Sequence, residues 1–373
     1  MNIPFFDYKN LYNRFKPEFI KIFDDVCSRG AFILQKDLEE FENLLKNFTG
    51  IKHVLGVNDG TNAMIIGMNC IGFEPEDEII ISSHTYIATA AAIKLSGAKP
   101  ICADIDDNGL LCSKSASKII TANTKAIMPT QLNGRCCDMK AIKHLSNLKG
   151  IDLFEDSAQG LGARESGTHA GGFGRFGTLS FYPAKLIGCF GDGGAILTND
   201  DEIYEKAKMY RDHGRDSKGF VAGLGTNGRL DNLQAAFLSL RLKNFGEDIK
   251  RRREIATFYN NILSKSKLFK VPTVENDEKG NFNVFQNYEI EIQDRDNFKS
   301  FLEKNGISTL IQWGGNAIYD IPSFENTRST LINYEKTDLF FKRCLMLPMH
   351  MGLNDDHLNY IEKILNQYLD RNS

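Results

Sequence analysis

Along this chain of 373 residues, the apolar positions first recur with the period of a helix. Further on, segments with the period of a strand alternate with segments with the period of a helix. Residues 11–48 carry two helical patterns, and the second begins near residue 35 and ends before residue 50. From there on, short β-rich runs alternate with helical patterns. The runs are residues 53–57, 78–82, 100–104, 125–129 and 151–155, and the helical patterns include residues 88–95 and 139–148. This alternation is typical of βαβ units and predicts a largely parallel sheet covered on both faces.

The second half of the chain predicts a different arrangement of strands and helices. Two more strands are expected at residues 177–181 and 195–198, and a long helical region follows at residues 233–263. The remainder predicts a strand, a helix, a second strand and a closing helix at residues 287–292, 296–304, 307–311 and 355–369. We therefore expect an α/β protein of two domains: residues 1–240, a large domain with a helical N-terminal segment, and residues 241–373, a small α+β domain joined to it by a long helix.

Composition removes several classes of function. An apolar fraction of 42%, a charged fraction of 25% and a net charge of −3 are ordinary for a soluble protein and indicate neither a nucleic-acid nor a membrane partner. The basic run at residues 250–253 lies within a helical pattern and is interpreted as a solvated or interface helix face. Eight cysteines show no C-x-x-C spacing, so neither a metal site nor a disulfide framework is expected. No secretory pattern and no stretch of 18 apolar residues occurs, which predicts a cytoplasmic protein.

Residues 56–64 (GVNDGTNAM) carry the first candidate chemistry. A strand end runs into a Gly-Thr turn and then into a helix of small and apolar residues. Free N–H groups and the positive end of a helix dipole suit a phosphate. A plain strand-to-helix turn explains the same pattern.

The second candidate site is at residues 151–159 (IDLFEDSAQ), where an apolar strand ends in Glu155 and Asp156. Ligand sites in open α/β sheets collect at the carboxyl ends of strands, so a carboxylate here points into the expected crevice. The alternative is that Asp156 only caps the next turn.

Residues 180–185 (SFYPAK) carry the third, because Lys185 follows a strand and precedes the glycine-rich residues 188–194. Such a lysine is either a solvated surface residue or a buried amine beside a cofactor. A phosphate turn, a carboxylate at a strand end and a lysine within one βαβ domain together match pyridoxal phosphate. That cofactor needs a phosphate cradle, an acid partner for its pyridine nitrogen and an amine for its aldehyde.

These segments, together with residues 191–194 (GDGG), 225–236 (GTNGRLDNLQAA) and 344–349 (CLMLPM), resemble the sugar aminotransferases of the DegT/DnrJ/EryC1/StrS family. The motifs recur in family order from about residue 30 to residue 240. The resemblance implies the aspartate-aminotransferase-like fold, fold type I of the pyridoxal-phosphate enzymes, with a mostly parallel mixed sheet in the large domain. It also implies a homodimer in which each active site borrows residues from the partner.

The resemblance also implies roles for individual residues. Lys185 holds the cofactor as a Schiff base, Asp156 faces the pyridine nitrogen, and Gln159 lies near the ring hydroxyl. A phosphate group is held by four residues of this subunit and one of the partner, with an aromatic ring stacked on the cofactor. The four residues of this subunit are Gly60, Thr61, Asn62 and Ser180, and the residue of the other subunit is Asn227. The stacked ring is that of Tyr86, within residues 84–89 (HTYIAT).

The chemistry explains why these residue types are needed. When the donor loses its Cα proton, electrons flow into a pyridinium ring that has to stay protonated, and an ionised carboxylate about 3 Å away favours that charged form. Free lysine titrates near about 10.4, so Lys185 can act as a base only if burial and neighbouring positive charge lower its pKa. Lys185 and Asp156 are thus the expected catalytic pair.

Substrate contacts are less well determined by the sequence. Arg229 is a candidate for the donor carboxylate because a guanidinium can pair with it bidentately, although an ordinary salt bridge is the alternative. Many relatives carry a Pro-x-His segment where this chain reads IQWGGNAIY at residues 311–319. Trp313 and Tyr319 there either stack on a sugar or a base or pack in the core. His169, Arg135 and His213 are further candidates for the same pocket.

By resemblance, the chain is expected to be a transaminase that moves an amino group from an amino acid, L-glutamate, to a nucleotide-linked keto-deoxyhexose at C4. The alternatives are amination at C3 and a non-catalytic, cofactor-bound regulator. The expected pathway is deoxyamino-sugar biosynthesis for a cell-surface polysaccharide. Relatives that dehydrate deoxysugars have histidine in place of the lysine, and Lys185 is intact here. A nicotinamide oxidoreductase is disfavoured because the two G-x-G-x-x-G segments, residues 172–177 and 223–228, do not open a helix in an N-terminal βαβ unit.

Overall fold

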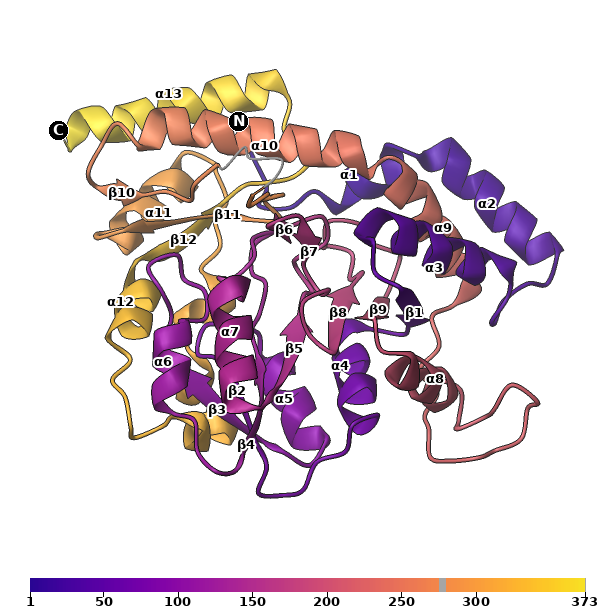
Figure 1. Ribbon diagram of the computed structural model, residues 1–373. Helices are drawn as coiled ribbons and strands as arrows, with labels where there is room; N and C mark the ends of the chain where they lie inside the picture. Colours follow the sequence, from indigo (N-terminus) through magenta and orange to yellow (C-terminus); the bar gives the residue numbers. More distant parts are fainter. Residues whose placement is uncertain (275–279, 373) are drawn as a thin grey trace.

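The computed structural model describes residues 1–274 and 280–372 and shows the expected α/β architecture (Figure 1). A seven-stranded sheet has the order β1-β9-β8-β5-β4-β2-β3. Neighbouring strands from β8 through β5, β4 and β2 to β3 are parallel, whereas β9 pairs antiparallel with both β8 and β1. The strands of this sheet are β1 (His53–Val57), β2 (Glu78–Ser82), β3 (Lys99–Ala103), β4 (Thr124–Met128), β5 (Asp152–Asp156), β8 (Phe176–Ser180) and β9 (Gly194–Thr198).

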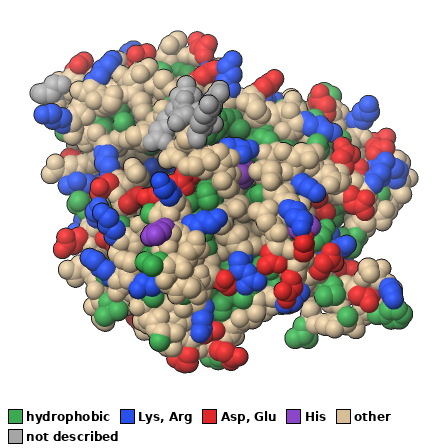
Figure 2. Space-filling view, in the orientation of Figure 1, with side chains coloured by type: hydrophobic (Ala, Val, Ile, Leu, Met, Phe, Trp, Pro, Cys, Tyr) green, Lys and Arg blue, Asp and Glu red, His purple; other side chains and the backbone are tan. Residues whose placement is uncertain are grey.

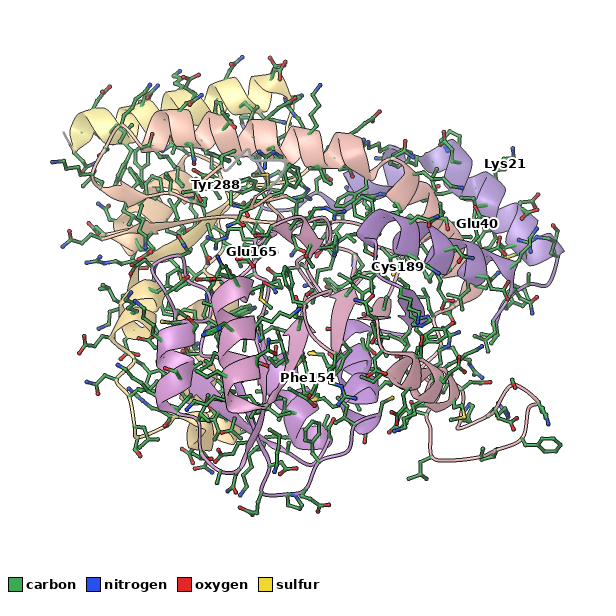
Figure 3. All side chains as sticks on the ribbon, viewed as in Figure 1. Lys21, Glu40, Phe154, Glu165, Cys189 and Tyr288 are labelled. Carbon is green, nitrogen blue, oxygen red and sulfur yellow. The ribbon has the colours of Figure 1, made fainter. Side chains whose placement is uncertain are left out.

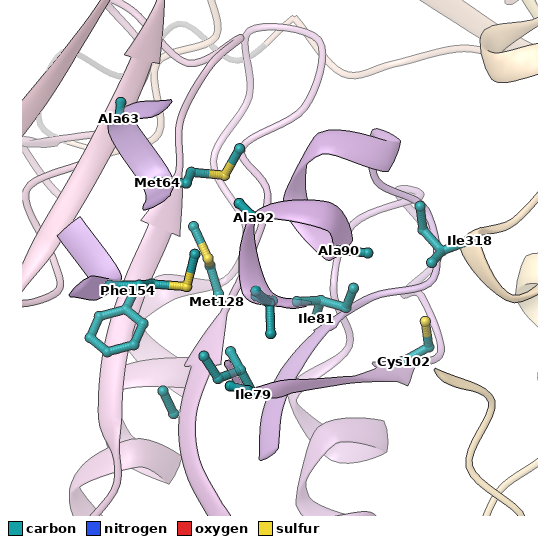
Figure 4. Packing of buried hydrophobic residues seen from close by; sticks show 14 of the residues in the cluster. Ala63, Met64, Ile79, Ile81, Ala90, Ala92, Cys102, Met128, Phe154 and Ile318 are labelled. Atoms are coloured by element: carbon teal, nitrogen blue, oxygen red, sulfur yellow. The ribbon is translucent and has the colours of Figure 1, made fainter. Parts of the chain in front are cut away.

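Helices cover both faces of this sheet, and the side chains of its strands alternate between the two layers. Ile79 and Ile81 of β2 and Phe154 of β5 face one core, while Ile80 and Leu153 face the other. The first core is closed by α4 (Gly60–Asn69) and α5 (Ile87–Leu95), and Figure 4 shows its packing. The second is closed by α6 (Ser113–Lys118) and α7 (Met139–Lys149). Period-two alternation in the strands thus decides which helix each residue meets.

The C-terminal part forms a second layer system. An antiparallel sheet of β10 (Phe269–Lys270), β11 (Tyr288–Ile292) and β12 (Cys344–Leu347) packs against α10 (Phe245–Leu263) and α13 (Asp355–Arg371). Tyr259 of α10 and Tyr288 of β11 are fully buried and stack with ring centroids 4.7 Å apart. Figure 3 labels Tyr288 on the side of the sheet that faces α10.

The other elements connect these layers. The helices among them are α1 (Tyr8–Asn13), α2 (Lys16–Ser28), α3 (Lys36–Thr49), α8 (Asp201–Tyr210), α9 (Asn232–Lys243), α11 (Arg295–Lys304) and α12 (Glu335–Arg343). Three 3-10 turns, η1 (Gln312–Gly315), η2 (Ile318–Asp320) and η3 (Pro322–Thr327), follow α11, and a short hairpin is made by β6 (Arg164–Glu165) and β7 (Thr168–His169). Across residues 1–274 and 280–372, no helix combines the length and apolarity needed to cross a membrane.

Two expectations need correction. The strand expected at residues 307–311 is wrong: Ile307 makes one bridge to Ile3 and Leu310 one to Met346, so no continuous ladder forms. The long helical region at residues 233–263 is divided into α9 and α10 at Asn244. The seven expected strands of the large sheet agree with the observed ones to within one residue at each end. The division of the chain at residue 240 stays a prediction.

A segment between α8 and α9 extends away from the body of the molecule (Figure 1). Its side chains Phe220, Val221 and Leu224 are 69%, 69% and 91% exposed. Figure 2 shows hydrophobic side chains at this projection. Large apolar side chains on an extended loop are typical of a surface that a partner covers.

Candidate functional site

The candidate site is built at the carboxyl ends of the central strands. Asp156 is the last residue of β5 and Ser180 the last residue of β8, and these two strands are neighbours in the sheet. Lys185 follows β8 through a turn in which its N–H donates to the carbonyl of Tyr182 at 2.8 Å. The topology therefore brings the carboxylate of Asp156 to the same edge of the sheet as the hydroxyl and the amine of the later segment at residues 180–185.

Asp156 is 2% exposed and receives two hydrogen bonds. Its Oδ2 accepts from the Thr89 hydroxyl at 2.6 Å, and its Oδ1 accepts from the N–H of Ala158 at 3.1 Å. Both partners are donors, so each oxygen of the carboxylate is held in place by a hydrogen bond. Asp156 thus does more than cap the following turn.

A chain of three threonine hydroxyls leads to this carboxylate. Thr89 contacts Thr85 at 2.7 Å, and Thr85 contacts Thr130 at 2.6 Å. Because the single hydroxyl proton of Thr89 is used on Asp156, Thr85 has to donate to Thr89, and Thr130 to Thr85. The donors therefore all point toward Asp156.

Glu155, next to Asp156, points to the other side of the strand and holds a loop. It is fully buried, and its carboxylate accepts from Gln131 Nε2 at 2.8 Å and from the N–H groups of Gly171 and Phe173 at 2.8 and 2.6 Å. Burial raises its pKa, while these donors act in the opposite direction. Of the two carboxylates at this strand end, Asp156 is the one that shares the site with Lys185.

The Lys185 amine carries a perturbed pKa. Burial lowers it from 10.5 to about 8, and the nearby Asp156 carboxylate acts against that decrease. The expectation that neighbouring positive charge contributes is not met, since desolvation alone accounts for the direction. A lysine of this kind holds a useful fraction of neutral amine near neutral pH.

The turn before α4 is where the sequence predicts an anion cradle. Asp59 caps the helix and accepts from the N–H of Asn62 at 2.8 Å and from its side-chain amide at 2.6 Å. The N–H groups of Gly60 and Thr61 belong to the first helical turn and have no partner within the helix. A Cβ on Gly60 would lie 2.9 Å from the Cβ of Ser180, so glycine lets the helix end approach that hydroxyl.

Gln159 follows β5 three residues after Asp156, and Tyr86 directly precedes α5. The Oε1 of Gln159 accepts from the N–H of Asn133 at 2.8 Å. Tyr86 is 53% exposed, and its ring centroid lies 6.2 Å from that of Trp313. Trp313 has a left-handed backbone (φ 48°), which is strained for a non-glycine residue, and its ring also lies 5.0 Å from that of buried His84.

The remaining candidates have other partners. Arg229 makes an ion pair with Asp212 at 2.6 Å, and its buried Nε has no hydrogen-bond partner within the described ranges. Asn227 is exposed on the projecting segment. Tyr319 is 5% exposed and donates to Asp338 at 2.9 Å. His169 is buried with both ring nitrogens bonded to backbone groups, those of Ala170 and Gly162.

These observations agree with comparisons to known proteins. The model of the DegT/DnrJ/EryC1/StrS aminotransferase family matches residues 13–366. The chain belongs to this family. It is 35% identical over 365 residues to the UDP-2-acetamido-2-deoxy-3-oxo-D-glucuronate aminotransferase of Pseudomonas aeruginosa, covering 96% of this chain and 98% of the relative. It is 34% identical over 375 residues to a pleiotropic regulatory protein of Geobacillus stearothermophilus, covering 99% of both chains.

Among solved structures, DesV of S. venezuelae in complex with a ketimine intermediate is similar, with a TM-score of 0.92 and 31% identity over 98% of each chain. The expected fold type is thereby confirmed, and the protein is a pyridoxal-phosphate-dependent aminotransferase. The residues present fit this cofactor. A helix end offers N–H groups for its phosphate, Asp156 can face its ring nitrogen, and the amine of Lys185 has the lowered pKa that bonding to an aldehyde needs.

Sequence reasoning missed the threonine chain. Thr85 and Thr89 lie in the segment quoted for Tyr86, and Thr130 follows the next strand of the sheet, so all three come after strand ends. Two hydroxyls four residues apart at a helix start were the available signal. Their contact with Asp156, which lies 67 residues away from Thr89, was not visible in any local pattern.

Substitution of Thr89 tests this chain. We expect Thr89→Val to lower kcat by about one to two orders of magnitude, because a buried carboxylate loses a donor and a buried hydroxyl loses its acceptor. Thr89→Ser keeps the hydroxyl and is the matched control. The measurement is the rate of amino-group removal from the donor in a stopped-flow experiment. Equal rates for the two variants would contradict a role of the hydroxyl.

The pH dependence of cofactor uptake tests the state of Lys185. Below its pKa the amine is protonated and cannot attack an aldehyde, so the rate of uptake by the cofactor-free protein should rise as the pH passes through about 8. Asp156→Asn removes the charge that raises this pKa and should move the midpoint lower. Asp201→Asn, at a carboxylate with a 69% exposed side chain, is the control and should leave it unchanged. A wild-type midpoint near that of free lysine would contradict the prediction.

Proposed function

We propose that this enzyme transfers an amino group from an amino acid, L-glutamate, to a nucleotide-linked keto-deoxyhexose. The observation that carries the proposal is the Lys185 amine, with its lowered pKa, beside the buried, doubly hydrogen-bonded Asp156. The name of the Pseudomonas aeruginosa relative, an aminotransferase of a UDP-linked oxo sugar, supports the class of acceptor.

Each residue of the site has a defined task in this proposal. The bound cofactor supplies a ring that accepts electron density from the carbon that loses its proton. Asp156, oriented by Thr89, keeps the ring nitrogen protonated by its negative charge. Lys185 Nζ holds the cofactor between reactions, and once released it carries the proton away from the donor carbon. Gly60, Thr61 and Ser180 hold the phosphate, with Asn62 beside them.

We place the acceptor sugar beside Trp313. Tyr86, which is half exposed, stays the candidate for stacking on the cofactor, and the adjacent ring of Trp313 suits the face of a sugar or a base. The strained backbone of Trp313 supports a functional position for its ring. Arg229 stays a candidate for the donor carboxylate, provided that it exchanges Asp212 for it. Tyr319 stays a candidate, although its hydroxyl is engaged by Asp338.

The position of amination has two candidates. The family resemblance favours C4, and the 3-oxo sugar in the name of the Pseudomonas aeruginosa relative favours C3. A regulator without turnover is the second candidate function, because the Geobacillus stearothermophilus relative is named a pleiotropic regulatory protein. The intact pair of Lys185 and Asp156 supports turnover over regulation. The proposal includes a cytoplasmic location and a product used in a cell-surface polysaccharide.

A homodimer with shared active sites is part of the proposal. Asn227 lies on the projecting segment, near the exposed Phe220, Val221 and Leu224, and is exposed itself. An exposed apolar loop is stabilised when a second subunit covers it. On this arrangement Asn227 of each subunit contacts the phosphate bound by the other.

Separate half-reactions test the function. Addition of L-glutamate to the purified protein should convert the bound cofactor to its amine form, which is seen as a change in its absorption spectrum. Nucleotide-linked 3-keto and 4-keto sugars are then added one at a time, and the one that restores the original spectrum is the acceptor. Lys185→Arg is the control and should show neither change. No spectral change with any amino acid would support the regulator instead.

Complementation tests the shared sites. Lys185→Ala and Asn227→Ala variants should each be inactive or weakly active alone. Mixed after partial unfolding and refolding together, they should form heterodimers with one intact site, because the intact Lys185 and the intact Asn227 then meet across the interface. Activity should rise several-fold over that of either variant treated alone. If Asn227 acted within its own subunit, mixing would restore nothing.

A further inference from the structure

Asn133 is a buried residue that links the site to the C-terminal sheet. It follows β4, is 1% exposed, and has a left-handed backbone (φ 57°), which asparagine adopts more readily than most residues. Its N–H donates to Gln159 Oε1 at 2.8 Å, and its carbonyl accepts from the N–H of Gln286 at 3.1 Å.

The side chain of Asn133 is also fully used. Its Oδ1 accepts from Asn287 Nδ2 at 2.8 Å, and its Nδ2 donates to Glu289 Oε2 at 2.7 Å and to Gln312 Oε1 at 3.3 Å. Glu289 and Gln312 are 6% and 2% exposed. Gln286 and Asn287 just before β11, Glu289 in β11 and Gln312 in η1 therefore hold Asn133. The remaining polar group of Asn133, its backbone N–H, contacts Gln159.

This contact determines the orientation of the Gln159 amide. A backbone N–H can only donate, so the amide atom that faces it has to be the oxygen. The NH2 end of Gln159 is then left over, and it has no hydrogen-bond partner within residues 1–274 and 280–372. A rotated amide would leave the buried N–H of Asn133 without an acceptor, which is unfavourable.

We propose that Asn133 is a positioning residue for the cofactor: it holds the Gln159 amide with its NH2 end toward the ring oxygen, and Glu289, Asn287 and Gln312 hold Asn133. The inference rests on the proposed placement of Gln159 near the ring hydroxyl. A donor at that oxygen stabilises its anionic form, so the network adjusts the protonation of the bound cofactor from behind the site. It also couples the C-terminal sheet to the cofactor ring.

The test is a pH titration of the cofactor absorption in the holoenzyme. Asn133→Gly keeps the N–H and tolerates the left-handed backbone, but it removes the contacts to Glu289, Asn287 and Gln312. We expect the titration midpoint to rise by about one pH unit, because the anionic ring oxygen loses a fixed donor. Ser166→Gly, at an exposed left-handed position in the β6–β7 turn, is the matched control and should leave the midpoint unchanged.

Three further variants separate the possible outcomes. Glu289→Leu should shift the midpoint in the same direction, whereas Glu289→Gln, which keeps an oxygen acceptor, should have a midpoint near that of the wild type. If Asn133→Gly does not fold, this pair of variants tests the role of Asn133. Gln159→Leu should shift the midpoint as well, and adding Asn133→Gly to it should cause no further shift.

An incorrect placement of Gln159 and an incorrect role for Asn133 would give different results. A midpoint unmoved by Gln159→Leu would overturn the placement of Gln159 and with it the basis of the inference. A midpoint moved by Gln159→Leu but unmoved by Asn133→Gly and Glu289→Leu would overturn the role of Asn133 alone. Additive shifts in the double variant would likewise show that Asn133 does not act through Gln159.

Discussion

The site depends on keeping a carboxylate and an amine close together in a partly dehydrated space. Burial lowers the pKa of Lys185, and the charge of Asp156 limits that decrease. If Asp156 were free to turn, it could pair with the amine and raise the pKa of Lys185 toward that of a solvated lysine. The hydrogen bonds from Thr89 and Ala158 prevent this by fixing both carboxylate oxygens. The threonine chain is therefore as much a part of the electrostatics as the two charged groups.

The same constraint explains the arrangement of the sheet. Because β4, β5 and β8 are parallel neighbours, the residues after their ends meet at one edge, where Thr130, Asp156 and Ser180 lie. Glu155 uses the alternation of the strand to reach the opposite side, where it binds the loop at residues 171–174. One strand thus supplies both a residue for the site and the support behind it.

Much of this could be predicted from residues that are close in sequence. The strands of the large sheet follow from apolar runs of five residues, and Lys185 and Asp156 from motifs that end strands. Contacts between distant segments could not be predicted, such as Thr89 with Asp156 or Asn133 with Glu289. The strand expected at residues 307–311 failed for a similar reason, since strand pairing depends on partners that the local pattern does not contain. Tyr319 illustrates the same limit, because an aromatic residue near a substrate motif can instead be buried and hydrogen-bonded to a neighbour, here Asp338.

The helix α10 belongs to two hydrophobic cores at once. Phe245 and Ile249 near its start pack with residues of the large sheet, whereas Ile255, Tyr259 and Leu263 pack beneath the C-terminal sheet. The helix has 19 residues and is about 28 Å long. Because each end is packed in a different core, it cannot bend freely between them. Loss of either core would leave half of the helix without its apolar contacts. The two layer systems should therefore melt as one cooperative unit rather than one after the other.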